Sequence, residues 1–558
     1  MENKDIARVF KLCAKLMELH EENSFRTRAM STAAFRIEKL PFPARTADLE
    51  TLSQQDKIGK STAEKIIQVV TSGTFPELDA LLAKTPAGVL ELLQIKGLGP
   101  KKVLTIWKTL DIESVGELFY ACNENRLIEA KGFGLKTQEE IKKAIEFSMA
   151  SQGLFHWAKV AGPAEEVHNA LHQALPDCSI SFTGAYRRKT EILDKIEILI
   201  AAAPSVVEQA IRSLDFEFDI HIDAATITFR DKDGVPFEVS SCTRQDFAKT
   251  LLMTTGSESH LAGLEKRASI PALETEEKIY RALKMDYIEP ELREGNQEIE
   301  WAESGKLPTL IQYSDLKGTL HNHSTYSDGV NTLEEMARFC KETLQLEYLG
   351  ICDHSKTAVY AGGLTIEEVE AQWQEIDVLN EKLSPFKIFK GIESDILSDG
   401  GLDYPNDILA GFDFVVASIH SGLKMDSDRA TQRLIKAIEN PYTTILGHPT
   451  GRLLLSRAGY PIDYKKVIDA CAANQVIIEI NANPLRLDLD WRWHQYALEK
   501  GVRLAINPDA HRTAGFYDMH HGVQVARKGG LTAKQCLNAL TLDEISAYFQ
   551  TRKATYSP

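Results

Sequence analysis

Histidine and carboxylate side chains recur at the ends of short apolar runs after residue 317. His321 and His323 end one such run, and side chains at positions i and i+2 of a strand share a face. A single histidine of this kind would more often be a hydrogen-bonded core residue, but a set of them is typical of metal ligands. The candidate ligands are His321, His323, Asp328, His354, Glu393, His420, His448, Asp509 and His511.

Nine candidate ligands exceed the needs of one ion, because four ligands fill a tetrahedral site. The set therefore predicts two or three divalent metal ions with bridging carboxylates and open positions for water. Imidazole with carboxylate favours Mn²⁺, Zn²⁺ or Fe²⁺ over Ca²⁺. Such a centre hydrolyses phosphoesters, since the ions activate water and neutralise phosphate oxygens. Its expected catalytic residues are His321, His323, Glu393 and Asp509.

Two arginines could assist this chemistry. Arg452 and Arg486 lie in loops that follow apolar runs, and a guanidinium can bind phosphate through two parallel hydrogen bonds. The alternative is a structural role on the barrel, and for Arg486 an ion pair with the nearby Asp488.

The elements that must position these residues alternate between short apolar strands and amphipathic helices from residue 317 onward. This alternation predicts parallel β/α units, and their number favours a barrel. The carboxyl ends of parallel strands converge on one mouth, so the candidate ligands can meet there.

The ligand pattern resembles the polymerase-and-histidinol-phosphatase (PHP) domain, in the order His-x-His, Asp, Asp-His, Gly-x-Glu, His, Gly-His-Pro and Asp-x-His. The resemblance implies a distorted (β/α)₇ barrel with a trinuclear centre. It assigns one ion to His321, His323, Glu393 and Asp509, a second to Glu393, His420 and His448, and a third to Asp328, His354 and His511. Thr319 departs from the family, which usually has Asp there.

Three glycine-containing turns in residues 1–150 each open a helix, at 57–66, 96–106 and 131–141. Glycines permit positive φ and close backbone approach, and a helix start offers free N–H groups to a DNA phosphate. Plain helix-to-helix turns are the alternative. The turns resemble the helix-hairpin-helix motif, although Lys57 replaces the first glycine of the first copy. The candidate DNA-binding residues are Gly97, Gly99, Lys101, Lys102, Gly132, Gly134 and Lys136.

The middle of the chain resembles the palm of family X DNA polymerases, in Gly184-Ala185-Tyr186-Arg187-Arg188 and the turn Thr255-Gly256-Ser257. The family holds two Mg²⁺ ions with three aspartates, but the matching positions carry Lys195, Glu197 and Glu238. A lysine ammonium repels the ions that must approach this place. We therefore expect polymerase activity to be lost, with an active polymerase as the alternative.

Lys65 aligns with the Schiff-base lysine of the related lyase domain, so we include it among the catalytic candidates. An ordinary surface lysine is the alternative.

The composition of the 558-residue chain, with a net charge of −16 and scattered cysteines, limits its class and location. The first 150 residues are nearly neutral, so the remainder carries the negative charge and bulk coating of DNA is disfavoured. Eight single cysteines without a C-x-x-C motif are typical of a cytosolic protein. The chain has no run of about 18 apolar residues and no secretory signal, which predicts the bacterial cytosol or nucleoid and no membrane partner.

The expected architecture is a multidomain α/β chain. It comprises a helical helix-hairpin-helix domain (1–150), a degenerate α+β palm and thumb resembling nucleotidyltransferases (151–290), a linker (291–316) and the PHP barrel (317–558).

The chain as a whole resembles bacterial family X polymerases with a C-terminal PHP domain. The predicted function is metal-dependent hydrolysis at DNA 3′ ends, gaps, nicks or abasic sites, including 3′–5′ exonuclease and 3′-phosphatase activity. A small-molecule phosphatase is a further alternative, and the sequence indicates no protein partner.

Overall fold

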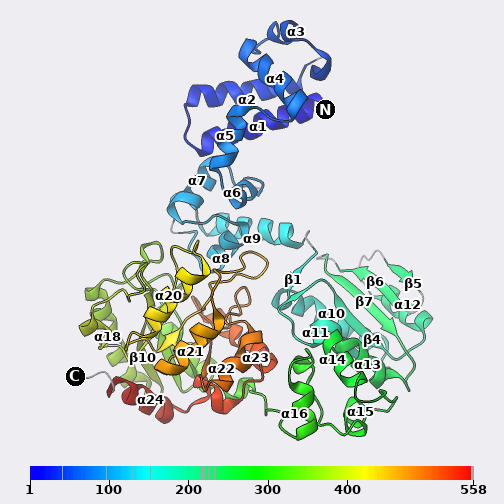
Figure 1. Ribbon diagram of the computed structural model, residues 1–558, viewed down its shortest axis with the longest axis vertical. Coiled ribbons are helices and arrows are strands. Elements are labelled where there is room, and N and C mark those ends of the chain that lie inside the picture. Colours follow the sequence, from blue (N-terminus) through cyan, green and yellow to red (C-terminus); the bar gives the residue numbers. More distant parts are fainter. Residues whose placement is uncertain are drawn as a thin grey trace. The chain divides into compact units, whose positions relative to one another are not determined.

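The computed structural model describes residues 1–40, 42–95, 97–128, 130–150, 153–214, 220–223, 226–231 and 234–554. It divides into two compact units, Met1–Phe147 and Ser148–Pro558, and each is described by itself (Figure 1). Within the described ranges, none of the helices has both the length and the apolarity that a bilayer crossing requires.

The first unit is helical, as expected. Its first helix begins at a capping box between Glu2 and Asp5, and its apolar positions Ile6, Phe10 and Met17 are buried. Its helices are α1 (Asn3–Leu19), α2 (Ser24–Glu38), α3 (Leu49–Ser53), α4 (Lys60–Ser72), α5 (Pro76–Lys84), α6 (Ala87–Leu92), α7 (Pro100–Thr109), α8 (Val115–Asn123) and α9 (Leu135–Ala150).

The second unit begins with a mixed sheet whose strand order is β2-β4-β7-β6-β5. The central strands β4 and β7 are parallel, and their register places Glu197 beside Glu238. A separate two-stranded ribbon pairs β1 with β3. The strands are β1 (Phe155–His156), β2 (Ile180–Thr183), β3 (Ile192–Leu193), β4 (Ile196–Ile200), β5 (His221–Asp223), β6 (Thr226–Arg230) and β7 (Pro236–Ser241). The helices up to residue 304 are α10 (Trp157–Ala174), α11 (Gly184–Arg187), α12 (Pro204–Ser213), α13 (Phe247–Thr255), α14 (Glu258–Glu265), α15 (Glu276–Ala282) and α16 (Glu298–Ser304).

Residues 291–316, which we expected to form a linker, pack into this unit instead. Ile299 and Leu310 belong to a buried cluster with α13 to α15, and Ile311 is fully buried. The Ile311 amide donates a hydrogen bond to the Leu531 carbonyl at 2.9 Å. The segment is polar on average but contains a few apolar residues. These residues are buried, and their packing fixes the segment to the rest of the unit.

Seven parallel strands form the barrel, in the order β14-β13-β12-β11-β10-β9-β8. A parallel bridge between Asn322 and Ala510 joins the two outer strands just beyond their ends. The strands are β8 (Gly318–Thr319), β9 (Tyr348–Ile351), β10 (Lys387–Asp395), β11 (Phe414–Ser418), β12 (Ile445–Leu446), β13 (Ile477–Asn481) and β14 (Leu504–Asn507). The helices around them are α17 (Leu333–Arg338), α18 (Ile366–Leu383), α19 (Asn406–Leu409), α20 (Ser427–Ile438), α21 (Tyr464–Asn474), α22 (His494–Glu499), α23 (Met519–Lys528) and α24 (Leu542–Ala554).

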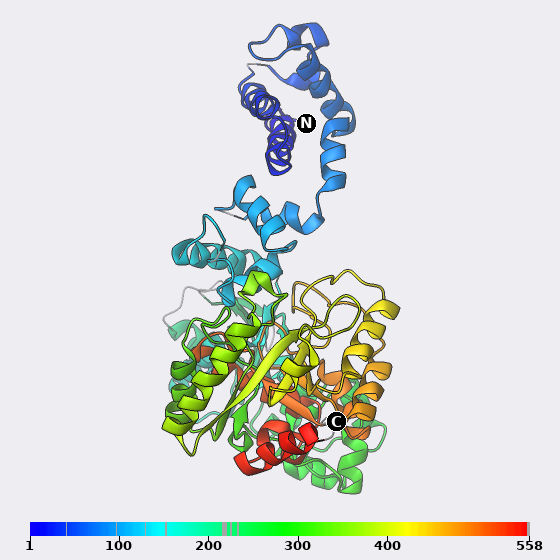
Figure 2. The same cartoon turned by 90° about the vertical axis from the view of Figure 1, so that its left-hand side faces the viewer.

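Aromatic side chains fill the barrel where the strands begin. Phe549 of the C-terminal helix α24, red in Figure 2, stacks on Phe414 at 5.2 Å and meets Phe389 edge-on at 5.1 Å between ring centroids. Gly350 and Gly391 have no room for a side chain, because a Cβ on either would lie within 2.6 Å of the Phe414 ring. The starting end of the barrel is thereby closed, which leaves the carboxyl ends of the strands for chemistry.

A buried lysine joins the barrel to the preceding domain. The Lys528 side chain has no exposed surface, and its Nζ pairs with Glu294 and donates to the Arg188 carbonyl at 3.1 Å. Burial lowers the pKa of Lys528, although Glu294 opposes that shift. The two domains thus share a buried ion pair, and Glu294 also pairs with Arg188 Nε at 3.1 Å.

We predict that Lys528→Ala lowers the free energy of unfolding of this unit by about 2 kcal/mol, because the buried hydrogen bonds of Lys528 to Glu294 and the Arg188 carbonyl are lost while Glu294 keeps its 3.1 Å pair with Arg188. Chemical denaturation followed by circular dichroism measures the change. Lys553→Ala is the matched control, since its 3.3 Å pair with Asp413 is partly exposed and we expect a loss below about 1 kcal/mol. Equal losses in the two variants would contradict the structural role of Lys528.

Candidate metal centre and nucleic-acid interface

The nine expected metal ligands converge at the carboxyl ends of the barrel strands. His321 and His323 follow β8, Glu393 lies near the end of β10, and Asp509 follows β14. The whole set is buried, and the His420 side chain, at 10%, is the most exposed member. Among the described residues of the second unit taken by itself, three groups have ligand atoms close enough for one ion: His323, Asp328, His354 and His511; His321, His323 and Glu393; and His354, Glu393 and His420.

Glu393 occupies the centre of the set. Its Oε1 lies 3.3 Å from His321 Nε2, 3.1 Å from His420 Nε2 and 3.0 Å from His448 Nε2. Its Oε2 lies 3.0 Å from His354 Nδ1. One carboxylate that faces imidazoles on both oxygens has the geometry of a bridging ligand.

Asp328 organises the other side of the centre. Its carboxylate lies 3.2 Å from His511 Nε2 and 3.5 Å from His354 Nε2. This matches the third ion of the family resemblance, with the addition that His323 joins the same group. His354 also joins Glu393 and His420, so the groups share ligands more than the resemblance assigns.

Two carboxylates that the sequence analysis missed orient the histidines. Glu479 of β13 accepts a hydrogen bond from His321 Nδ1 at 2.7 Å, and Asp395 accepts one from His420 Nδ1 at 2.5 Å. Each bond turns the Nε2 atom of its histidine toward Glu393. The sequence did contain a sign of this role, because each of the two acidic residues interrupts an otherwise apolar strand. In the structure Glu479 is 0% exposed and Asp395 5% exposed.

The electrostatics of the centre favour cations. Burial alone would raise the pKa of Glu393, but the charges of His420, His321 and His354 hold it well below its usual range. Against burial, His511 and His354 likewise lower the pKa of Asp328. Burial alone would lower the pKa of His354. The charges of the neighbouring Asp328 and Glu393 outweigh that effect and raise the pKa to about 10. The buried carboxylates therefore keep their charges and need positive partners.

The residues present fit divalent metal ions. Among the described residues, His321 Nε2, His323 Nδ1 and Glu393 Oε2 are buried atoms that make no hydrogen bond, and their neighbours at 3.3, 3.8 and 3.0 Å are side chains of the same cluster. Orphaned buried polar atoms are costly unless something binds them. His448 and Asp509 also adopt positive φ angles of 20° and 55°, a strained backbone typical of functional sites.

The two arginines have different positions. Arg452 is not available to a phosphate, contrary to our expectation: its guanidinium pairs with Asp490 and donates to the carbonyls of Arg486 and Leu487. Arg486 lies beside the metal cluster, with its Nε 3.9 Å from Asp509 Oδ2. The expected partner Asp488 instead accepts hydrogen bonds from Thr450.

Lys195, Glu197 and Glu238 lie close together in the mixed sheet of the second unit. Lys195 Nζ lies 2.7 Å from Glu238 Oε2 and 3.6 Å from Glu197 Oε1. Burial lowers the pKa of Lys195, but the hydrogen bond and charges of the two glutamates outweigh it and raise the pKa. The lysine thus supplies the positive charge that metal ions would otherwise bring.

The three N-terminal turns share a backbone conformation. Lys57, Gly97 and Gly132 have φ angles of 62°, 94° and 93°. Lys57 therefore adopts the left-handed conformation of the glycine it replaces. A Cβ added at Gly59, Gly97, Gly99, Gly132 or Gly134 would meet nothing within 4 Å, so this face of each turn is open. The neighbouring Lys101 and Lys136 are exposed, whereas Lys102 Nζ donates back to the Gly97 carbonyl at 3.4 Å.

Lys65 on α4 forms an ion pair with Glu77 and lies 5.4 Å from the centre of the Phe75 ring. Nucleophilic attack requires an amine that is free of such a pair. The arrangement supports the alternative structural role over a Schiff-base role.

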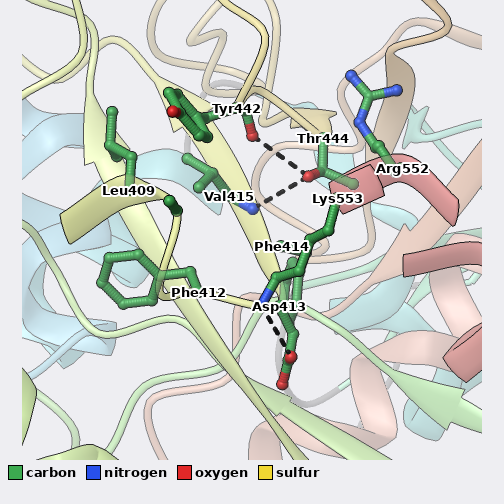
Figure 3. A pocket seen from close by; sticks show the side chains of 10 residues that line it. Leu409, Phe412, Asp413, Phe414, Val415, Tyr442, Thr444, Arg552 and Lys553 are labelled. Carbon is green, nitrogen blue, oxygen red and sulfur yellow. Dashed lines mark hydrogen bonds and ion pairs between the residues drawn. The ribbon is translucent and has the colours of Figure 1, made fainter. Parts of the chain in front are cut away.

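A separate cavity of about 170 Å³ lies where the barrel strands begin, beside α24 (Figure 3). Thr444 there accepts a hydrogen bond from the Val415 amide and donates one to the Tyr442 carbonyl. Lys553 pairs with Asp413. Because Phe414 begins β11 and His420 follows its end, this cavity is not the metal centre.

Four family models match the chain. They are a helix-hairpin-helix domain (1–75), a SAM-like helix-hairpin-helix tandem (89–146), the DNA polymerase beta thumb (257–294) and a PHP domain (319–483).

Similar proteins of known description fall into two groups. A "DNA polymerase/3′-5′ exonuclease PolX" from Bacillus subtilis (strain 168) is 34% identical over 582 aligned residues, which cover 99% of this chain and 100% of that protein. A probable phosphatase from Thermoanaerobacter sp. (strain X514) is 32% identical over 246 residues, 42% of this chain and 94% of that protein. A probable phosphatase from Acetivibrio thermocellus is 28% identical over 200 residues, 34% of this chain and 78% of that protein.

We predict that Glu479→Gln weakens Mn²⁺ binding by about 10- to 100-fold, because His321 loses the carboxylate that orients it. Isothermal titration calorimetry measures the affinity. Glu347→Gln is the matched control, since Glu347 caps the Leu542 amide near the start of β9. Unchanged Mn²⁺ affinity in Glu479→Gln would refute the orienting role.

We predict that Gly99→Val weakens binding of a DNA duplex by roughly tenfold, because the new side chain stands where a phosphate would approach the backbone amides. Fluorescence anisotropy at fixed salt measures the affinity. Gly99 has a φ of −89°, so valine fits the backbone and the thermal midpoint should change little. Gly162→Val, at an equally open position in α10, is the control, and equal DNA affinity in both variants would count against the hairpin as a phosphate site.

Proposed function

The chain belongs to the family X DNA polymerases that carry helix-hairpin-helix, polymerase beta thumb and C-terminal PHP domains, and from this premise we propose that its PHP barrel hydrolyses phosphoesters of DNA. The principal reaction is removal of nucleotides from a 3′ end. Cleavage at abasic sites and removal of a 3′-phosphate use the same chemistry, attack of water on phosphorus.

The observation that carries this proposal is the buried ligand set around Glu393. Its carboxylate faces imidazoles on both oxygens, and several of the surrounding ligand atoms have no protein partner. Two or three divalent ions, with Mn²⁺ or Zn²⁺ favoured and Fe²⁺ compatible, suit this donor set. Such ions supply Lewis acidity and activate water for attack on phosphorus.

The chain's own residues then bind and orient the substrate. His321, His323, Glu393 and Asp509 would hold one ion, Glu393, His420 and His448 a second, and Asp328, His354 and His511 a third. Arg486, beside Asp509, offers its guanidinium to a phosphate oxygen. Glu479 and Asp395 keep the histidine rings in place.

DNA is the proposed macromolecular substrate. Helix-hairpin-helix models cover most of the first unit, and their open turns suit backbone phosphates without reading sequence. The relative matched along its whole length is described as both a polymerase and a 3′–5′ exonuclease. We infer a role in repair of gapped, nicked or 3′-end structures, in the bacterial cytosol beside the chromosome.

Polymerase activity is proposed to be lost. The ion pair of Lys195 with Glu238 fills the place where the family binds metal ions, and the ammonium repels them. The palm and thumb are then a structural platform for the DNA and the barrel.

A phosphatase that acts on small molecules is the second candidate, because the probable phosphatases match 42% and 34% of the chain, a length that the barrel alone could supply. It leaves the helix-hairpin-helix unit without a role. Under this alternative, a DNA competitor would leave hydrolysis of a small phosphate monoester unchanged, whereas a DNA enzyme would be inhibited.

We predict that the protein with Mn²⁺ shortens a 5′-labelled primer on a gapped duplex, even with all four nucleotides present. Glu393→Gln should slow shortening by at least about 100-fold, because it removes the shared charge of the centre. Lys195→Ala should leave it within about twofold. A denaturing gel measures the primer length after incubation with each of the three proteins. Lengthening of the primer by the native chain would overturn the proposed loss of polymerase activity.

A further inference from the structure

The palm contacts the barrel at the loops that carry the metal centre. The contact is made by the ribbon of β1 and β3, in which His156 pairs with Ile192. His156 Nε2 lies 3.1 Å from the Leu454 carbonyl oxygen. Glu191, next to β3, lies 3.6 Å from Arg452 Nη2. Both barrel residues belong to the loop that begins with the ligand His448, so the ribbon touches that loop twice.

Arg452 links three parts of the structure. Its Nε donates to the Arg486 carbonyl at 2.9 Å, and its Nη2 donates to the Leu487 carbonyl. The same guanidinium pairs with Asp490 and with Glu191 of the palm. Arg452 is 11% exposed and the Glu191 side chain 8% exposed, so these charges act in a medium of reduced dielectric.

Further bonds join the loop of His448 to the loop of Arg486. Asp488 accepts hydrogen bonds from the amide and hydroxyl of Thr450, at 2.8 and 2.9 Å. The Leu454 amide donates to the Leu485 carbonyl at 2.7 Å. Leu487 adopts a φ of 46°, a left-handed conformation that its surroundings must hold in place. The loop that carries Arg486 beside the metal ligands is therefore held in place by hydrogen bonds from the loop of His448.

We propose that Glu191 and Arg452 are positioning residues that hold Arg486 against the metal centre, so that the palm remains necessary for hydrolysis by the barrel. This inference rests on the proposed function, because it assigns Arg486 to the phosphate of that reaction. The ion pair with Glu191 holds the Arg452 guanidinium in place. Arg452 in turn donates hydrogen bonds to the Arg486 and Leu487 carbonyls. The backbone position of Arg486 then determines where its side chain can reach. A small misplacement of a phosphate-binding group is sufficient to reduce catalysis strongly.

The test is a double-mutant cycle between Glu191→Gln and Arg486→Ala in the full chain. Two quantities are measured in Mn²⁺: kcat/KM on a 3′-hydroxyl oligonucleotide, and the affinity for dTMP by calorimetry, which does not depend on turnover. Glu191→Gln should reduce both by about 10- to 100-fold, and in the Arg486→Ala background it should add less than about twofold.

Glu291→Gln is the matched control. Glu291 pairs with Arg527 at 2.9 Å across the same domain junction, with 13% exposure on both sides, but away from the loops of His448 and Arg486. Its thermal midpoint should fall about as far as that of Glu191→Gln, while both measured quantities stay within about twofold of the native chain.

Equal changes of kcat/KM and dTMP affinity in Glu191→Gln and Glu291→Gln would overturn the inference. It would also be overturned if Glu191→Gln reduced these quantities by the same factor in the Arg486→Ala background as in the native chain. Arg452→Lys, which keeps the charge but loses the planar fork, should resemble Glu191→Gln, and native values in that variant would also overturn it. If the native chain neither cleaves the oligonucleotide nor binds dTMP, the proposed function fails, and the inference fails with it.

Discussion

The buried charge of Glu393 is the constraint on which the catalytic half of the molecule depends. Four imidazoles lie within 3.3 Å of its carboxylate oxygens, and its side chain is 1% exposed. A carboxylate in that position is tolerable only with positive partners. The closed start of the barrel, the glycines around Phe414 and the orienting acids Glu479 and Asp395 keep those partners at the open end.

The palm meets the same electrostatic requirement in a different way. Glu197 and Glu238 lie side by side on β4 and β7, and Lys195 places one ammonium beside both carboxylates. Under the proposed function, the barrel site takes its cations from solution, whereas the palm site already contains an ammonium. This contrast would explain how a chain of the polymerase family could depend on its C-terminal barrel for chemistry.

Much of the site was predictable because it follows from strand geometry. Residues at the carboxyl ends of parallel strands meet at one mouth of a barrel, so the sequence was sufficient to predict that His321, His448 and Asp509 lie close together; their role as metal ligands stays a prediction. The role of Arg452 could not be read in the same way, because nothing in its spacing tells whether a guanidinium faces a ligand or a neighbouring loop. Segment 291–316 was misjudged because its composition is polar while its few apolar residues are buried. The left-handed Lys57 shows that tertiary structure can impose a conformation that the residue type disfavours.

The most direct test of the account is the location of divalent ions in crystals of the full chain soaked in Mn²⁺. Anomalous scattering at the manganese edge identifies the ions without reference to activity. We expect two or three peaks around Glu393, Asp328 and Asp509, and none between Glu197 and Glu238. A peak between the two palm glutamates, with Lys195 displaced, would contradict it.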